Sequence, residues 1–288
     1  MNKSIIAGLA TLSALSIAAM GGFATNVAPV AQAAQVHHIA KHAAAHTLKM
    51  QHIYLTILPG EHLGPDGKMH DTYSPADFTV VQGVPVQVTV YNYDGGSHSF
   101  TSTSLKVNKI IPGHKNKGVP SVTNFQFTPA KTGAFTWLCD VKCDGEANGW
   151  AMSHDGYMMG KVKVVPNNHK EQFVTLTIKD GLQYAAVDKQ LHDSYSPASF
   201  NVTAGVPVHM TVVNWDTGSH SMTAPEINLN KVFPGAPKEG VPSVTQFTFT
   251  VNKAGKYKWQ CEIKCDGGMK SFSMTHVGYM VGYVNAVN

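Results

Sequence analysis

The sequence predicts an all-β protein made of two tandem antiparallel β-sandwich or barrel domains, and three observations lead to this prediction. Apolar residues alternate with polar ones, as in Val86-Gln-Val88-Thr-Val90 and Phe135-Thr-Trp137-Leu-Cys139, which is the period of half-buried strands. Glycine and proline separate these short runs, and no long helical pattern interrupts them. The alternating runs then recur once along the chain, so the fold is expected to be duplicated.

The duplication has a constant offset. From Tyr73 onward the first copy aligns with the second from Tyr195 onward without an insertion, and corresponding residues lie 122 positions apart. Copies of this size are duplicated domains rather than the short units of a solenoid. The sequence therefore predicts one domain at 48–166 and another at 172–288, joined by a short polar linker.

The beginning of the chain has the features of a secretory signal peptide. An apolar run, Ile5–Met20, is followed by small residues that end in Ala31-Gln-Ala33-Ala34. This run is short for a membrane span of about 20 residues, so a cleaved signal at 1–34 is favoured over an uncleaved anchor. Residues 35–47 are rich in alanine and histidine and are expected to form a flexible leader. The mature chain is expected to be secreted or otherwise extracytoplasmic, without an integral membrane span.

The composition argues against a nucleic-acid partner. Charged residues make up 14% of the chain, and the net charge of +4 comes from scattered lysines rather than from a basic stripe.

The four cysteines all lie in two copies of one ligand pattern, in which a Gly-Ser-His precedes Cys-x3-Cys and His-x3-Met follows it. Thiolate, imidazole and thioether together suit copper better than the other common biological metals. The alternative for Cys-x3-Cys outside the cytoplasm is a local disulfide, but the recurring ligands beside it favour metal. The predicted copper ligands are His98, Cys139, Cys143, His154 and Met158 in the first copy, and His220, Cys261, Cys265, His276 and Met280 in the second.

Both copies resemble the cupredoxin domain of cytochrome c oxidase subunit II. The first copy does so through His98-Ser-Phe100 and through Gly133-Ala-Phe-Thr-Trp-Leu-Cys139-x3-Cys143, and the second repeats the latter in Gly255–Cys265. The closing His276-x3-Met280-Val-Gly282 is similar to the end of cupredoxins generally. The resemblance implies two Greek-key β-sandwiches of the cupredoxin type.

The resemblance also implies a dinuclear, mixed-valence copper centre (CuA) in each domain. The two cysteine sulfurs of a copy would bridge the coppers, its two histidines would be terminal ligands, and its methionine and a backbone carbonyl would complete the set. The ten residues between Cys143 and His154 and the three between His154 and Met158 are longer spacings than in that family. The second of them resembles mononuclear blue-copper proteins. Because loops vary more freely in length than ligands vary in kind, two coppers per domain are expected, with a mononuclear site as the alternative.

The expected function is electron transfer between redox partners such as a cytochrome or an oxidase, by a protein that is not itself an enzyme. A multicopper enzyme of the nitrite-reductase or laccase kind is disfavoured, because such enzymes need further histidine clusters and neither Cys139 nor Cys261 has a histidine neighbour. A non-redox copper carrier on the same scaffold is the remaining alternative, since fold does not fix function.

Overall fold

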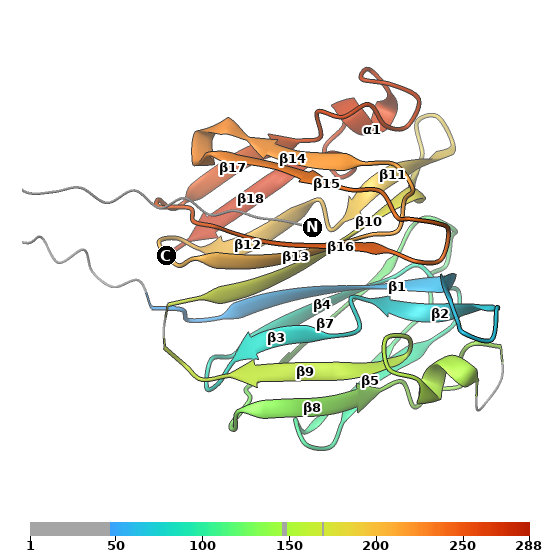
Figure 1. Ribbon diagram of the computed structural model, residues 1–288, viewed down its shortest axis with the longest axis vertical. Coiled ribbons are helices and arrows are strands. Elements are labelled where there is room, and N and C mark those ends of the chain that lie inside the picture. Colours follow the sequence, from blue (N-terminus) through green and yellow to red (C-terminus); the bar gives the residue numbers. More distant parts are fainter. Residues whose placement is uncertain (1–46, 146–148, 169) are drawn as a thin grey trace, which may run out of the picture. The chain divides into compact units, whose positions relative to one another are not determined.

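The computed structural model describes residues 47–145, 149–168 and 170–288 (Figure 1). The predicted signal peptide at 1–34 and residues 35–46 of the predicted leader lie outside these described residues. Within them the elements are strands, apart from two 3-10 turns and one four-residue helix. The all-β prediction is therefore confirmed. None of the described helices is long and apolar enough to cross a membrane.

The first domain is a sandwich of two sheets, each with non-consecutive strands as neighbours. One sheet has the order β2 (Met69–Ser74), β1 (Gln51–Leu63), β4 (Val86–Asn92) and β7 (Ser121–Phe127). The other has the order β3 (Phe78–Val81), β9 (Met159–Val165), β8 (Gly133–Leu138), β5 (His98–Ser102) and β6 (Val107–Ile111). A short 3-10 turn, η1 (Trp150–Ser153), precedes β9.

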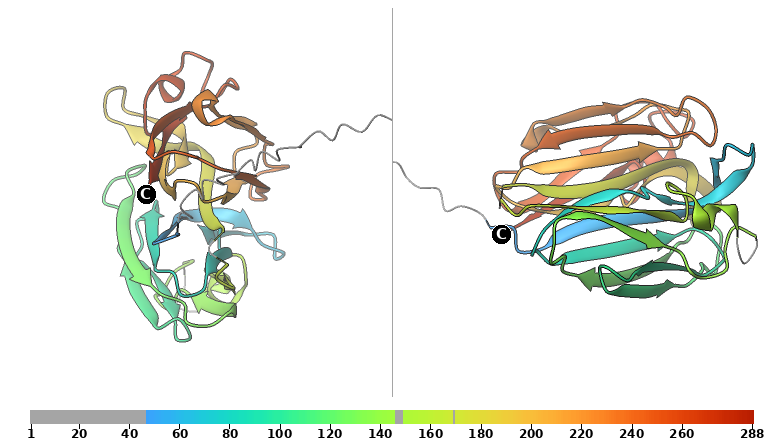
Figure 2. Two further views of the ribbon diagram at one scale, coloured as in Figure 1. Left: turned by 90° about the vertical axis from the view of Figure 1, so that its left-hand side faces the viewer. Right: turned by 60° about the horizontal axis from the view of Figure 1, so that its bottom comes forward.

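The second domain repeats this arrangement strand for strand. Its strands have the yellow-to-red colours in Figure 2. Its first sheet has the order β11 (Gln190–Ser196), β10 (Gln172–Ala185), β13 (Val208–Asn214) and β16 (Ser243–Phe249). Its second has the order β12 (Ser199–Thr203), β18 (Val281–Val287), β17 (Gly255–Gln260), β14 (His220–Ala224) and β15 (Leu229–Phe233). The short elements are η2 (Pro225–Ile227) and α1 (Phe272–Thr275). The duplicated sandwich predicted from the repeat is confirmed.

The sheets are not purely antiparallel, which corrects one detail of the sequence prediction. β1 pairs with β4 in parallel, and so does β3 with β9; the second domain repeats both pairings. Parallel neighbours cannot be joined by a tight hairpin. The chain therefore leaves each sheet and returns to it, and these crossings bring strand ends from distant parts of the sequence together.

The alternating residues fill the space between the two sheets of each domain. Val86, Val88 and Val90 have no exposed surface, and neither has Trp137. The Trp137 ring stacks on Phe100 with 4.7 Å between the ring centroids, and its indole N–H donates to the carbonyl of Ala76 at 2.9 Å. This core fixes β5 against β8, the two strands whose ends carry the predicted ligands.

The two domains contact each other through a buried polar network that follows their internal symmetry. The Thr56 hydroxyl donates to Ser196 Oγ at 2.9 Å, and the equivalent Thr177 hydroxyl lies 2.9 Å from Ser74 Oγ. The indole N–H of Trp215 also donates to Ser74 Oγ, at 2.8 Å. All of these side chains are buried, so their hydrogen bonds hold the interface in one register.

Candidate metal centre

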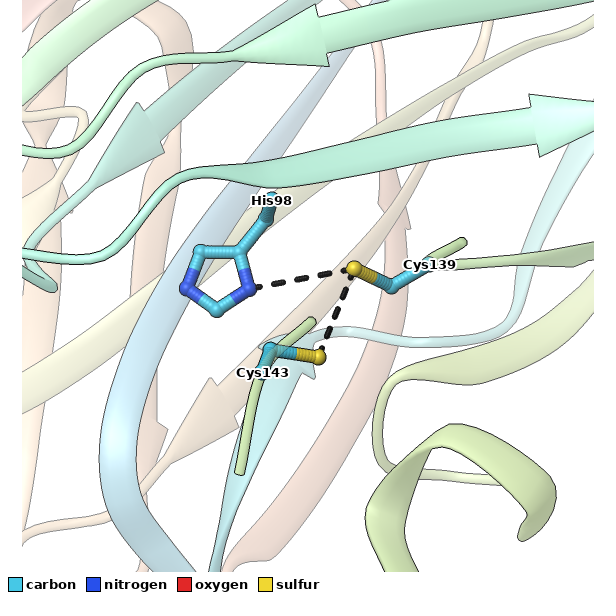
Figure 3. A group of neighbouring side chains, drawn as sticks. All are labelled: His98, Cys139 and Cys143. Atoms are coloured by element: carbon cyan, nitrogen blue, oxygen red, sulfur yellow. Dashed lines mark hydrogen bonds between the residues drawn. The ribbon is translucent and has the colours of Figure 1, made fainter. Parts of the chain in front are cut away.

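The ends of two neighbouring strands bring three of the predicted ligands together in each domain. His98 begins β5, and Cys139 directly follows β8, which pairs with β5 through Thr101 and Leu138. The imidazole of His98 and the sulfurs of Cys139 and Cys143 lie within 4.8 Å of one another (Figure 3). The second domain gathers His220, Cys261 and Cys265 in the same way.

A carboxylate orients each of these buried histidines. Nε2 of His98 lies 2.8 Å from Asp94 Oδ2, which leaves Nδ1 facing the Cys139 sulfur at 3.9 Å. In the second domain, Nε2 of His220 lies 2.7 Å from Asp216. Histidines that bind metals typically hold their other nitrogen in this way, because the carboxylate fixes both the tautomer and the ring orientation.

One buried nitrogen in the second domain provides a test of whether a metal fits. Nδ1 of His220 is buried and has no hydrogen-bond partner among the described residues. A buried polar atom normally has a partner. This nitrogen belongs to the His220, Cys261 and Cys265 group, so its position is that of a donor to a metal. The residues present therefore fit a soft metal ion in this place.

The paired sulfurs share one proton in the metal-free protein. All four cysteines are free thiols, and the sulfurs of Cys139 and Cys143 lie 3.4 Å apart. The hydrogen bond from Cys143 lowers the pKa of Cys139, and holding the shared proton raises the pKa of Cys143. The backbone N–H of Ser99 also donates to the Cys139 sulfur, at 3.3 Å. The site thus stabilises a thiolate, the form of cysteine that binds metal.

The charge of His98 depends on the Cys139 sulfur and on Asp94. Burial by itself would lower the pKa of His98, but the hydrogen bonds with Asp94 and with the Cys139 thiolate outweigh burial and raise the pKa to about 9. Burial would likewise lower the pKa of His220, but the hydrogen bond with Asp216 and the nearby charge of the Cys261 sulfur outweigh burial and raise the pKa to about 9. In the metal-free protein each site therefore holds an imidazolium beside a thiolate, and a bound cation would take the place of the imidazole proton.

The two predicted methionines belong to the same buried regions as the cysteines. Met158 has no exposed surface, packs in the core cluster that contains Cys139 and Cys143, and accepts a hydrogen bond at its carbonyl from the Cys139 amide. Met280 is equally buried, and its carbonyl accepts the same bond from Cys261.

The predicted second histidines are not among the groups that the structure gathers at the cysteines, and their role as copper ligands remains a prediction. The His154 ring stacks on Trp150 with 3.5 Å between the centroids, and its Nδ1 lies 2.7 Å from the Trp150 carbonyl oxygen. His276 stacks on Phe272 at 3.8 Å and contacts the Phe272 carbonyl in the same way. The reason is local. The stretch before each histidine forms a helical turn, and the histidine that follows the turn contacts the aromatic residue four positions back.

The structure places another methionine at the cysteines of the second domain. Met274 is buried, and its Sδ lies 2.8 Å from the Cys265 sulfur. Its counterpart Met152 packs against the core cluster of the first domain. The sequence carried a signal for these residues, because they recur at the same 122-residue offset as the ligands. The carboxylates Asp94 and Asp216 recur in the same way and were also missed.

An open pocket of about 440 Å³ gives access to the first site. It is bordered by His98 and Cys143, by the acidic residues Asp71, Asp94 and Asp144, and by Lys142. A cation or a partner surface can therefore approach the second cysteine from solvent.

Comparison with known proteins supports the cupredoxin interpretation for the first half of the chain. The family model described as cupredoxin-like domain matches residues 30–149. No curated protein matches the chain. The match supports copper as the cofactor that was predicted from the donor set. The finer likeness to the copper domain of the oxidase subunit remains a prediction.

Solved structures of copper proteins are similar to this chain at low identity. A copper nitrite reductase from Nitrosomonas europaea is 14% identical, with 83% of this chain and 95% of that chain covered and a TM-score of 0.31. A copper-containing nitrite reductase from Thermus scotoductus SA-01 is 14% identical, with 83% and 62% covered and a TM-score of 0.31. The multicopper oxidase mgLAC is 13% identical, with 82% and 86% covered and a TM-score of 0.30.

These comparisons correct the expectation that the protein is not an enzyme. The similar solved structures are named as nitrite reductases and multicopper oxidases, and these are enzymes. The assignment as a non-enzyme is therefore withdrawn.

Proposed function

We propose that each domain binds copper at its histidine and paired cysteines, and that the protein transfers single electrons between redox partners. One observation carries the proposal: in both domains an imidazole and two thiols lie within 4.8 Å of one another. These groups are held in the interior of a rigid sandwich. Bound copper would supply a one-electron couple, and soft sulfur donors with imidazole suit it.

The surrounding residues support this function by restricting how the donors can move. Asp94 holds the ring of His98, and the Ser99 amide holds the Cys139 sulfur. Trp137 and Phe100, both without exposed surface, pack in the core cluster that contains Cys139 and Cys143. Donors that keep their positions when the charge of the site changes are what rapid electron transfer requires, and the dry surroundings and hydrogen bonds tune the potential.

Reversible redox chemistry tests the proposal. The copper-loaded protein is expected to have visible absorption from thiolate–copper charge transfer. A reductant should remove this absorption and an oxidant should restore it. A variant with Cys139→Ser and Cys261→Ser should lose this absorption.

A protein that binds copper tightly but cannot be reversibly reduced and oxidised would instead be a copper carrier. The contact of Met274 with Cys265 favours this second candidate, because thiolate and thioether donors select Cu(I).

The number of coppers per domain is a finer part of the proposal. Paired thiolates support a dinuclear centre, because a mononuclear blue-copper site uses one thiolate. Such a centre would need His154 to leave Trp150 when metal binds. Two coppers per domain, with an EPR signal from one electron shared by two copper nuclei, are expected. One copper per domain, with hyperfine structure from a single nucleus that survives Cys143→Ser, would establish the mononuclear alternative.

We also propose that the chain works outside the cytoplasm as two copper-binding units, 48–166 and 172–288. The N-terminal sequence supports export, and free thiols in that oxidising setting would be protected by bound metal. Mass spectrometry of the exported protein tests this proposal, with a mature chain that starts after Ala33 or Ala34 as the expected result. A chain that retains residues 1–34 would contradict it.

A further inference from the structure

Three hydrogen-bonded residues, the buried His70 and the partly buried Asp71 and Asp144, connect β2 to the loop that carries the second cysteine. We call the group of His70, Asp71 and Asp144 the clamp of the first domain. Nδ1 of His70 lies 2.8 Å from Asp144 Oδ2, and its Nε2 lies 3.0 Å from Asp66. The Asp71 amide donates to the Asp144 carboxylate at 3.2 Å, and the Asp144 amide donates to the Asp71 carboxylate at 2.9 Å. Asp144 directly follows Cys143, so these bonds fix the backbone next to the sulfur.

The second domain has the same clamp, formed by His192, Asp193 and Asp266. Nδ1 of His192 lies 2.8 Å from Asp266 Oδ2, and the Asp266 amide donates to the Asp193 carboxylate at 2.9 Å. In both domains the last aspartate also accepts an amide of the following helical turn, from Ala151 in one and from Ser273 in the other.

Two physical features indicate that the clamp fixes the position of the loop. The side chain of His70 is 5% exposed, and that of Asp144 is 10% exposed. Burying ionisable groups costs desolvation that their attraction often fails to repay, so such a pair is a weak source of stability. Asp144 has a φ of 57° and Asp266 a φ of 51°. Residues other than glycine rarely adopt this left-handed backbone unless their surroundings impose it. The clamp supplies that constraint at the residue beside the ligand.

We propose that the clamp is the positioning device that holds the second cysteine of each domain opposite the first, so that both sulfurs bind the same metal centre. The inference rests on the proposed copper function. Cys139 needs no such device, because it directly follows β8 and is fixed by the strand. Cys143 lies in a loop that has two polar ties to the sheets. The Ser99 hydroxyl of β5 holds Asp140 near the first cysteine, and the clamp holds Asp144 beside the second.

A double-mutant cycle tests the proposal in the full chain. The background carries Cys261→Ser and Cys265→Ser, so that only the first domain has thiols. Anaerobic Cu(I) binding is measured by competition with a coloured Cu(I) chelator. Asp144→Asn is expected to weaken Cu(I) binding by about 10- to 100-fold, the usual cost of losing an outer contact to a metal ligand. When Cys143 is already serine, the same change should cost less than about twofold, because the clamp acts through that sulfur.

A matched control separates positioning from a general loss of charge or structure. Asp77 is an exposed aspartate of the same domain, and it also accepts a backbone amide, from Lys161 at 2.7 Å. Asp77→Asn should leave Cu(I) affinity unchanged. If Asp144→Asn prevents folding, as judged by circular dichroism, His70→Phe replaces it, because it keeps a ring against Trp150 while removing both N–H donors. Equal costs of Asp144→Asn with and without Cys143 would overturn the proposal.

A measurement on the metal-free protein tests the clamp independently of copper binding. In the reduced, metal-free background, Cys143 should react about tenfold faster with a thiol reagent after Asp144→Asn. A local opening of the loop then no longer breaks a hydrogen bond to a charged group. An unchanged rate would contradict the clamp even if copper binds. A background protein that binds no Cu(I) would instead contradict the proposed function, and the thiol reaction would still decide on the clamp.

Discussion

Single carboxylates decide how the two imidazoles face the sulfurs. Asp94 lies four residues before His98 and contacts the ring nitrogen that points away from the cysteines. The aspartate is itself held, because its amide donates to Asn92 Oδ1 at 2.8 Å and its Oδ1 accepts the Gly96 amide at 3.1 Å. The ring is therefore oriented before any metal arrives, which lowers the entropic cost of binding.

Replacing this carboxylate should weaken one site and spare the other. With Asp94→Asn, the amide group can present an N–H to the ring and no longer fixes its tautomer. Copper affinity of the first domain is expected to fall by about 10- to 100-fold, while the second domain, with Asp216 intact, keeps its affinity. Titration with a competing chelator should then resolve two classes of site. A single class with the parent affinity would contradict this role for Asp94.

His70, on β2, makes the free energy of unfolding depend on pH. Burial alone would lower the pKa of His70, but its hydrogen bonds with Asp144 and Asp66 raise it above the ordinary value. Because the folded pKa is above the unfolded pKa of about 6.5, these bonds stabilise the fold fully below that pH. The contribution is lost as the pH rises through the folded pKa.

The parent and His70→Phe should therefore differ more at low than at high pH. The difference in the free energy of unfolding is expected to be larger at about pH 6 than at about pH 9, because the contribution of the charged ring falls as the pH rises through the folded pKa. Urea unfolding of the metal-free proteins, followed by circular dichroism, measures both values. Equal differences at the two pH values would show that the ring charge does not contribute.

The start of β9 is restricted by a close backbone approach. Gly160 pairs with Trp137, and a Cβ built on Gly160 would overlap the carbonyl of Ala76, which also accepts the Trp137 indole N–H. The backbone there cannot retreat without breaking that hydrogen bond. Gly282 stands in the same relation to Ala198 in the second domain.

Gly160→Ala is expected to lower the free energy of unfolding by about 1–3 kcal/mol, the usual cost of overpacking. Gly95→Ala is the control, because a Cβ at Gly95 would meet no atom within 4 Å. Urea denaturation of both variants measures the difference. An alanine that is tolerated equally at the two positions would contradict the steric argument.

Buried hydrogen bonds, inaccessible to water, join the two domains of the molecule. Ser74 accepts from the Trp215 indole and contacts the Thr177 hydroxyl, and each of these three residues is at most 4% exposed. An unpaired donor in such a place costs its full desolvation free energy.

Ser74→Ala should therefore destabilise the full chain by about 1–3 kcal/mol, because it leaves the Trp215 indole N–H without its partner. Ser104→Ala, at an exposed serine between β5 and β6, should have no measurable effect. Thermal or urea unfolding of the metal-free protein provides the comparison. Equal stability of the two variants would mean that water satisfies the donors and that the interface is open.

The sequence by itself determined the strands, the duplication and the donor chemistry. Alternation along Val86–Val90 reports which face is buried, because side chains of a strand point alternately to its two sides. The constant 122-residue offset between the two copies predicts the second domain. His98, Cys139 and Cys143 were predictable because strand ends and residue types are local properties.

Only the tertiary structure shows where the remaining candidate ligands lie relative to the cysteines. His154 and His276 follow helical turns and stack on Trp150 and Phe272, and the length of a loop does not specify such a direction. The two clamps are contacts between residues far apart in the chain. Asp144 and Asp71, for example, are 73 positions apart. The periodicity of apolar residues shows which side chains are buried, but not which residues they contact. Contacts of this kind form when the sheets pack, so they cannot be deduced from the sequence pattern alone.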